Sequence, residues 1–180
     1  LITDGAGALI MTRADRAKDF PNKPAYVLGV AADASHDQIA QMEDLTVTGA
    51  ARSGPRAYEM AGMGPSDMDV LELYDAFTIN TLLFLEDLGF CKKGEGGDWV
   101  TGGRLRFDRP SDGPALNTDG GGLSSNHPGM RGIFLLIEAT RQLRGESTSQ
   151  VEGAKLAVAH GNGGMLGSRH SAGTIILGGD

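Results

Sequence analysis

The middle of one predicted helix constrains the fold of this chain more than any other feature, because it is apolar on every face. The helix is expected to run from about Pro128 to Arg144, and Gly145 is placed to end it. Its residues Ile133–Ile137 read IFLLI. A helix without a polar side has to be covered all round, so we expect it to be central and fully buried in a layered domain.

Several short apolar runs have the length and composition of buried strands. They are Ala6–Thr12, Tyr26–Ala32, Val70–Leu73, Leu156–Ala159 and Thr174–Leu177. Further helices are expected at Arg13–Asp19, Pro55–Met60 and Ala76–Leu88. Strands that alternate with helices, and a hairpin formed by the last two strands, predict an α/β fold built on a mixed sheet. Residues 91–122 are rich in Gly, Pro and Asp and are expected to form a long loop over a site.

Composition excludes several classes of protein. Glycine accounts for 28 of 180 residues without a collagen period, so the glycines are expected where the backbone turns tightly or approaches a ligand. The net charge of −7 argues against a nucleic-acid binder. The one cysteine, Cys91, excludes an internal disulfide framework and a cysteine zinc site, and it points to a reducing cytoplasm. No apolar run is long enough to span a membrane, and the start at Leu1 indicates a piece of a longer protein.

Common phosphate-binding, nucleophile-elbow and metalloprotease motifs are absent, and three polar segments remain as candidate sites. The first is Tyr74-Asp75-Ala76-Phe77 at a strand-to-helix turn, where side chains point toward a site at the carboxyl edge of a sheet. In the alternative interpretation, Asp75 only caps the following helix and Tyr74 is a core residue.

The second segment joins Gly120-Gly121-Gly122 to His127, which precedes Pro128 and the apolar helix. The positive end of a helix disfavours an imidazolium, so a neutral His127 can donate to a developing oxyanion or act as a base. The glycines allow a ligand to lie against the backbone. The alternative is a histidine cap beside a glycine turn.

The third segment is His160-Gly161-Asn162-Gly163-Gly164 at the end of a predicted strand. Catalytic side chains are common at such strand ends, and backbone N–H groups of the loop can face an anionic oxygen. The alternative is a glycine-rich hairpin with a hydrogen-bonded histidine. No spacing typical of metal ligands is present, so no metal site is expected.

Taken in order, these segments resemble the C-terminal half of the thiolase superfamily, most closely its sterol-carrier-protein and lipid-transfer-protein branch. YDAF at Tyr74–Phe77 stands at the family's Asn-Glu-Ala-Phe or His-Asp-Cys-Phe block, and NHPG at Asn126–Gly129 stands at its Gly-His-Pro block. HGNGG at His160–Gly164 stands at its Cys-x-Gly block, and DGAGA at Asp4–Ala8 resembles the last piece of the N-terminal half.

The resemblance implies a thiolase-like layered α/β fold with helices on both faces of a mixed sheet. Residues 1–24 are then expected to supply the last strand and helix of the N-terminal half, and residues 25–180 the C-terminal domain. The resemblance also implies an acyl-CoA ligand, a homodimer and, in the lipid-transfer branch, a partner subunit with an OB-fold and a zinc ribbon. It implies no cofactor beyond coenzyme A as the carrier of the substrate.

The chain departs from the family where the family carries thiols. His160 stands in place of the third block's acid–base cysteine, and Tyr74 replaces the Asn or the alternative Cys of the first block. Cys91 is not at the position of the nucleophile, which the family carries in its first half. This pattern resembles aldolases that cleave β-hydroxyacyl-CoA. The expected catalytic residues are His127, Tyr74 and His160, and the expected residues for substrate and oxyanion binding are Gly121, Gly122, Asn162, Gly163, Gly164 and Asp75.

The predicted function is cleavage or formation of a carbon–carbon bond in an acyl-CoA thioester, of aldolase type in the complete protein. Two alternatives stay open: an acetyl-CoA acyltransferase with its nucleophilic cysteine in the missing half, and a non-catalytic lipid-binding or scaffold subunit. Because the family's site lies between two halves, the 180-residue chain alone is expected to be inactive and to associate with itself or with another subunit.

Overall fold

The computed structural model describes residues 2–108, 113–164 and 168–179, and it contains a five-stranded sheet of order β1-β5-β4-β2-β3. The strands are β1 (Tyr26–Gln38), β2 (Val70–Leu73), β3 (Ala115–Leu116), β4 (Leu156–Gly163) and β5 (Ser168–Gly178). β2 is parallel to β3 and β4, whereas β5 is antiparallel to β4 and β1. The predicted mixed sheet and late hairpin are confirmed.

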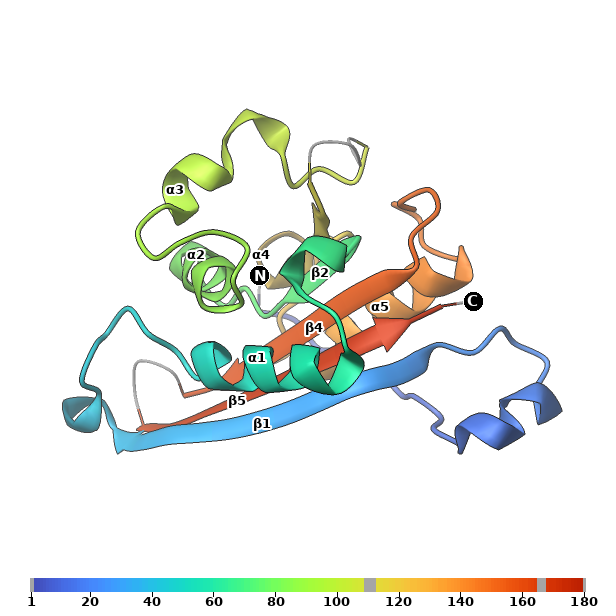
Figure 1. Ribbon diagram of the computed structural model, residues 1–180, viewed down its shortest axis with the longest axis horizontal. Coiled ribbons are helices and arrows are strands. Elements are labelled where there is room, and N and C mark those ends of the chain that lie inside the picture. Colours follow the sequence, from blue (N-terminus) through green and yellow to red (C-terminus); the bar gives the residue numbers. More distant parts are fainter. Residues whose placement is uncertain (1, 109–112, 165–167, 180) are drawn as a thin grey trace.

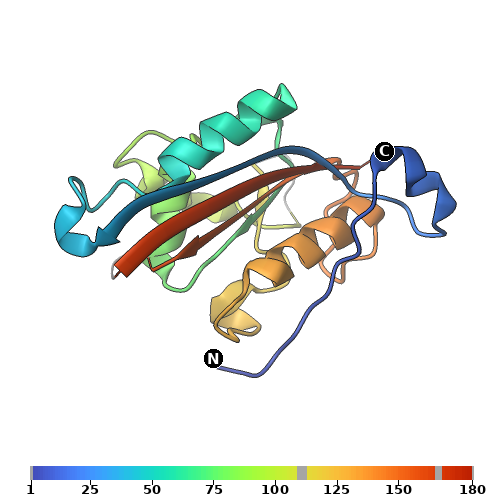
Figure 2. The same ribbon diagram turned by 90° about the horizontal axis from the view of Figure 1, so that it is seen from below.

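Helices cover both faces of this sheet (Figure 1). α1 (Ala50–Ala61) and α2 (Thr78–Asp87) pack on one face, and α5 (Gly132–Arg144) packs on the other, as Figure 2 shows from below. Short helices occupy the connections. They are η1 (Ala14–Asp19), η2 (Ile39–Gln41), η3 (Pro65–Asp67), α3 (Gly96–Trp99), η4 (Thr101–Gly103) and α4 (Gly121–Ser124). The expected long loop therefore contains α3, η4, β3 and the start of α4.

The strands divide their side chains between two cores. In β2, which is buried at all four positions, Leu71 and Leu73 belong to the core under α1 and α2, and Val70 belongs to the core under α5. β4 divides in the same way, with Val158 in the first core and Ala157 in the second. Because successive strand residues face opposite sides, the position of a residue along its strand decides which layer its side chain meets.

The segment Ala6–Thr12 is not a strand, contrary to the expectation. It runs as exposed chain without regular structure along α5, as Figure 2 shows. A strand needs a partner for its backbone groups. Among the described residues of this terminal segment, Ile2 alone forms a bridge, to His127, and Leu1 lies outside the described residues.

Two predicted helix starts are also wrong. α1 begins at Ala50, ahead of Pro55, with Gly49 as its N-cap residue, and Thr48 Oγ1 accepts the N–H of Ala50 at 3.2 Å. α5 begins at Gly132 instead of Pro128, after Gly129 has taken a left-handed φ of 89°.

The end of α5 at Gly145 is confirmed, because that glycine takes the left-handed conformation that closes a helix. The apolar middle of α5 is not fully buried, however. Leu135 faces the sheet and is buried, whereas Ile133, Phe134, Leu136 and Ile137 are half-buried. The terminal segment covers only part of the outer side of the helix, so the chain leaves an apolar flank of α5 partly open.

Candidate active site

Tyr74 and His127 form the centre of the candidate site. Tyr74 follows β2, and its backbone N–H donates to the carbonyl oxygen of His160 at 2.9 Å, so Tyr74 continues the sheet. Its hydroxyl oxygen lies 2.9 Å from Nε2 of His127, and the two rings meet edge to face. The hydroxyl can also donate to the carbonyl oxygen of Gly129 at 3.4 Å. The structure thus brings two of the predicted catalytic residues together, from positions far apart in the sequence.

A phenol bonded to an imidazole can pass a proton in either direction. An unprotonated Nε2 accepts the hydroxyl proton, and a protonated Nε2 donates to the phenol oxygen. His127 does not lie at a helix start, because four residues separate it from the first residue of α5. The helix dipole therefore does not explain its role, and its direct partner is the Tyr74 hydroxyl.

Asn117 fixes the end of β2 beside Tyr74. Its Oδ1 accepts the N–H of Leu73 at 2.8 Å, and its Nδ2 donates to the carbonyl oxygen of Leu73 at 2.9 Å. The side chain thus takes the place of a strand just after β3 has ended. Asn117 has a φ of 46°, a left-handed conformation that asparagine tolerates better than most residues. Sequence analysis missed Asn117, and an asparagine directly after a short apolar run is the one local signal for it.

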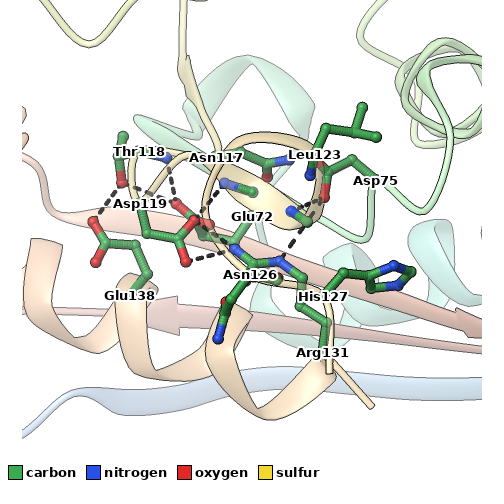
Figure 3. A network of polar contacts seen from close by, with 12 residues as sticks. Glu72, Asp75, Asn117, Thr118, Asp119, Leu123, Asn126, His127, Arg131 and Glu138 are labelled. Carbon is green, nitrogen blue, oxygen red and sulfur yellow. Dashed lines mark hydrogen bonds and ion pairs between the residues drawn. The ribbon is translucent and has the colours of Figure 1, made fainter. Parts of the chain in front are cut away.

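Arg131 fastens the loop that carries His127, as Figure 3 shows. Its side chain is fully buried. Nη1 donates to the carbonyl oxygen of Asn126 at 3.0 Å and to its side-chain oxygen at 2.6 Å, and Nη2 donates to both carboxylate oxygens of Asp119 at 2.6 and 2.5 Å. Nε lies 3.9 Å from the Asp75 carboxylate. A buried cation is tolerated only when it is paired in this way, so Arg131 ties the residue before His127 to the α4 loop. Sequence analysis missed Arg131, because an arginine in a polar loop looks like a surface residue.

Asp75 holds α4 and not a ligand. Its carboxylate oxygens accept the N–H groups of Gly122 at 2.6 Å and Leu123 at 3.3 Å. The Gly121 N–H donates to Asp119 at 2.8 Å, and Gly121, with a φ of 67°, lies so close to Asp75 that a Cβ would overlap the carboxylate. The capping role predicted for Asp75 therefore exists, but for α4 rather than the helix that follows it. The structure does not present Gly121 and Gly122 to a substrate, because carboxylates already occupy their N–H groups.

His160 lies on the other face of the sheet from the candidate site. Its ring packs edge-on against Phe84 of α2, with 4.6 Å between ring centroids, and its Nδ1 lies 2.8 Å from the hydroxyl of Thr174. Burial, and then the nearby His170, lower the pKa of His160 to about 3, so the imidazole is neutral at physiological pH. The expectation that His160 shares a cleft with Tyr74 is wrong, because β4 continues through this position and turns the ring toward α2.

An open cavity of about 820 Å³ adjoins Tyr74 on the α5 face. β4 contributes Gly161, Asn162 and Gly163 to its lining, and α5 contributes Gly132. Within the described part of the chain, none of the lining residues carries a charge. The structure thus places Asn162 and Gly163 at the cavity, whereas the predicted site residue Gly164 follows β4 in an exposed position. The cavity can receive an uncharged group next to the phenol–imidazole pair.

Two glutamates are buried close to the Arg131 loop, and sequence analysis missed both. The hydroxyl of Thr118 lies 3.0 Å from Oε1 of Glu72 and 2.6 Å from Oε1 of Glu138. A hydroxyl has one proton to donate, so one of these two contacts requires a protonated carboxyl. Burial, followed by the charges of Asp119 and Glu138, raises the pKa of Glu72 well above its ordinary value. Burial therefore favours the protonated form of Glu72. The sequence signal for both residues was a glutamate inside an apolar run.

Three further observations concern the rest of the described chain. Cys91 is half-buried, and burial raises the pKa of its thiol. In residues 2–108, 113–164 and 168–179, no group of three or more His, Cys, Asp or Glu side chains is arranged to hold a metal ion. No helix in these same ranges is both long and apolar enough to cross a membrane.

Comparison with known proteins gives consistent matches. The acetyl-CoA acetyltransferase of Methanothermobacter thermautotrophicus is 39% identical over 170 residues, which cover 93% of this chain and 44% of the relative. The 17-hydroxy-3-oxo-4-pregnene-20-carboxyl-CoA lyase of Mycobacterium tuberculosis is 35% identical over 161 residues, or 85% of this chain and 40% of the relative. A solved structure described as Ltp2-ChsH2(DUF35) aldolase superposes with a TM-score of 0.79 at 31% identity, over 93% of this chain and 42% of that one. The chain thus spans less than half the length of these relatives.

A family model described as Thiolase C-terminal domain-like matches residues 31–179, which include β2, the His127 loop and the β4–β5 hairpin. The match confirms the resemblance carried by the three polar segments, and the mixed sheet with helices on both faces agrees with it. The chain therefore belongs to the thiolase superfamily, in the family of C-terminal domains that this match defines.

Proposed function

We propose that the full-length protein acts on an acyl-CoA thioester and cleaves a β-hydroxyacyl-CoA between its α- and β-carbons. The observation that carries this proposal is the Tyr74 hydroxyl bonded to Nε2 of His127 beside an uncharged cavity. Thiolysis in this family uses a thiol as acid–base group, and Cys91 is not among the residues that line the cavity. Relatives whose names describe a CoA lyase and a steroid side-chain-cleaving aldolase support the same chemistry.

In this proposal the Tyr74–His127 pair takes the proton of the β-hydroxyl group. The O–H electron pair forms the carbonyl group of the released aldehyde or ketone. The Cα–Cβ bond breaks, and its electrons pass to the thioester as an enolate. The proton then returns to the α-carbon, so the reaction consumes no co-reactant. A phenol holds its proton tightly at neutral pH, so the imidazole is needed as the acceptor. Backbone N–H groups near Gly163 and Gly164 are our candidates to stabilise the enolate oxygen.

The test is product analysis with the full-length protein and a β-hydroxyacyl-CoA. Tyr74→Phe keeps the ring and removes the hydroxyl, and we expect at least about a tenfold loss of aldehyde or ketone release without a lower melting temperature. Tyr58→Phe is the matched control, because it makes the same change in a tyrosine buried in α1. Unchanged cleavage by the Tyr74 variant, or an equal loss in the Tyr58 variant, would remove Tyr74 from the mechanism.

An acetyl-CoA acyltransferase is the second candidate, and the 39% identity to an acetyl-CoA acetyltransferase favours it. It requires a nucleophilic cysteine outside these 180 residues. Consumption of free CoA without release of an aldehyde or ketone would establish it. A non-catalytic lipid-binding or scaffold subunit is the third candidate, and it would bind acyl-CoA without any turnover.

We further propose that residues 1–180 alone do not turn over, because they span less than half the length of the relatives. The full-length protein is proposed as a cytoplasmic homodimer that joins a subunit with an OB-fold and a zinc ribbon. The name of the structural neighbour, which pairs Ltp2 with ChsH2(DUF35), supports such a partnership. Turnover by the purified 180-residue chain would refute the first statement, and a strictly monomeric full-length protein in light scattering would refute the dimer.

A further inference from the structure

On the α5 face of the sheet, the size of the side chains changes where α5 begins. Under the helix this face carries Ala157 and Leu177, which are buried against it. Beyond the first residue of the helix, the strands line the cavity with Ala32, Gly161, Asn162, Gly163, Ser171, Ala172 and Gly173. Asn162 and its strand partner Ala172 share the register of His160, so their side chains point toward the α2 face. The positions that face the cavity are therefore all small: Gly161, Gly163, Ser171, Gly173 and Ala32. In this part of the sheet, the backbone on the α5 face is covered by few side-chain atoms.

Three of these small residues, Gly161, Gly173 and Ala32, form a row across the sheet that begins at Tyr74. Gly161 pairs with Gly173, and Gly173 pairs with Ala32. Tyr74 lies next to Gly161, because its N–H donates to the carbonyl oxygen of the preceding residue of β4. The row therefore crosses four neighbouring positions of the sheet. Adjacent strands lie about 4.8 Å apart, so the row extends about 14 Å from Tyr74 to Ala32.

The fold itself does not require the two central glycines. Neither Gly161 nor Gly173 has a left-handed φ. A Cβ on Gly173 would meet no atom within 4 Å, and a Cβ on Gly161 would only touch the Cα of Gly132 at 4.0 Å. Gly29 in β1 is different, because its Cβ would overlap the backbone of α1. Glycine weakens a strand, and where packing does not demand it, it marks a place where another group approaches the backbone.

We infer that this row is the floor of an acyl-binding surface, and that Gly161 and Gly173 make room for a long apolar acyl group whose reacting end lies at Tyr74. The inference rests on the proposed function for the thioester end of the ligand. The rest follows from the cavity: its lining carries no charge, its floor has no large side chains, and Met130 and Ile133 form part of its wall. An acetyl group fills only the end next to Tyr74 and leaves the rest of the row unused.

Binding of unreactive thioether analogues of CoA to the full-length protein tests the inference. Gly173→Val should weaken binding of a decanoyl analogue at least about tenfold, since a side chain in an apolar pocket excludes a group of similar size. Binding of an acetyl analogue should change less than about twofold. Gly97→Val is the matched control: Gly97 is exposed in α3, it lies outside the cavity, and its Cβ also meets no atom within 4 Å.

Two outcomes would overturn the inference. One is an equal effect of Gly173→Val on both analogues, or no effect on either. The other is a marked fall in melting temperature for both Gly173→Val and the smaller Gly173→Ala, because the row would then be packed by another part of the protein.

Failure of the proposed function gives a different result. If Tyr74→Phe leaves turnover unchanged but Gly173→Val still selects against the decanoyl analogue, the surface stands and the mechanism falls. If turnover depends on Tyr74 while the wild-type protein binds both analogues equally, the mechanism stands and the surface falls.

Discussion

Replacing Arg131 by methionine should lower the free energy of unfolding by about 3–5 kcal/mol. The guanidinium is fully buried and makes four hydrogen bonds, two to Asn126 and two to Asp119. Methionine fills a similar volume but leaves two carboxylates without their cation, and the side chains of Asp119 and Asp75 are only 19% and 7% exposed. An uncompensated buried charge costs more than the lost bonds alone. Because small domains are stable by about 5–15 kcal/mol, the change removes a large share of the total.

Urea unfolding of the full-length protein, followed by circular dichroism, measures this loss. Arg131→Lys keeps the charge but not the planar fork, so we expect an intermediate loss. Arg106→Met is the matched control: Arg106 is exposed and paired with Asp108, so its replacement should change the urea midpoint only slightly. If Arg131→Met lowers the free energy of unfolding no more than Arg106→Met does, the buried ion pair does not hold the His127 loop.

Three further predictions follow from buried groups. The raised pKa of Glu72 means that the folded state keeps a proton that the unfolded chain loses above the ordinary value of 4.5. Stability should therefore fall by about 1.4 kcal/mol per pH unit above that value, until the folded pKa is reached. Glu72→Gln should remove this dependence of stability on pH when melting curves are recorded across the pH range. A pH dependence that persists in the variant would contradict the raised pKa of Glu72. His160→Leu should lower the free energy of unfolding by about 1–3 kcal/mol and leave kcat nearly unchanged. A large fall in kcat at normal stability would instead show that His160 takes part in the reaction. Gly29→Ala should lower the free energy of unfolding by about 1–3 kcal/mol, because the added Cβ would overlap the carbonyl oxygen of Ala57. The control is Gly97→Ala, whose Cβ meets no atom within 4 Å, and equal denaturation midpoints for the two variants would contradict the clash.

The parts of the fold that were predicted correctly depend on local signals. Val70–Leu73 is a strand because a short apolar run suits a position buried on both faces. The end of α5 is also local, since Gly145 supplies the left-handed conformation that the helix needs. The segment Ala6–Thr12 has the same apolar character, but among the residues that the structure describes no strand pairs with its backbone. An apolar run thus predicts burial, and only a partner makes it a strand.

The site was predicted in part, and the missing part is tertiary. Tyr74 and His127 stood out because each lies at a motif boundary, although their contact joins loops 53 residues apart. Arg131, Asn117 and Glu72 did not stand out, because their burial depends on which loops meet around them. The sequence analysis assigned Gly121 and Gly122 to the ligand, whereas the fold uses their N–H groups to bind carboxylates.

The placement of His160 shows how a single strand register divides a motif between two roles. β4 pairs His160 with Thr174 and Gly161 with Gly173, so the imidazole faces α2 and the glycine faces the cavity. A shift of one residue would exchange these faces. Gly161 would then face Phe84, where the ring of His160 now fills the core. The imidazole would project into the cavity, which Gly161 now lines without a side chain. Packing under α2 therefore fixes the register, and the register gives the cavity a glycine. At this position the site gains space for a ligand instead of a catalytic side chain.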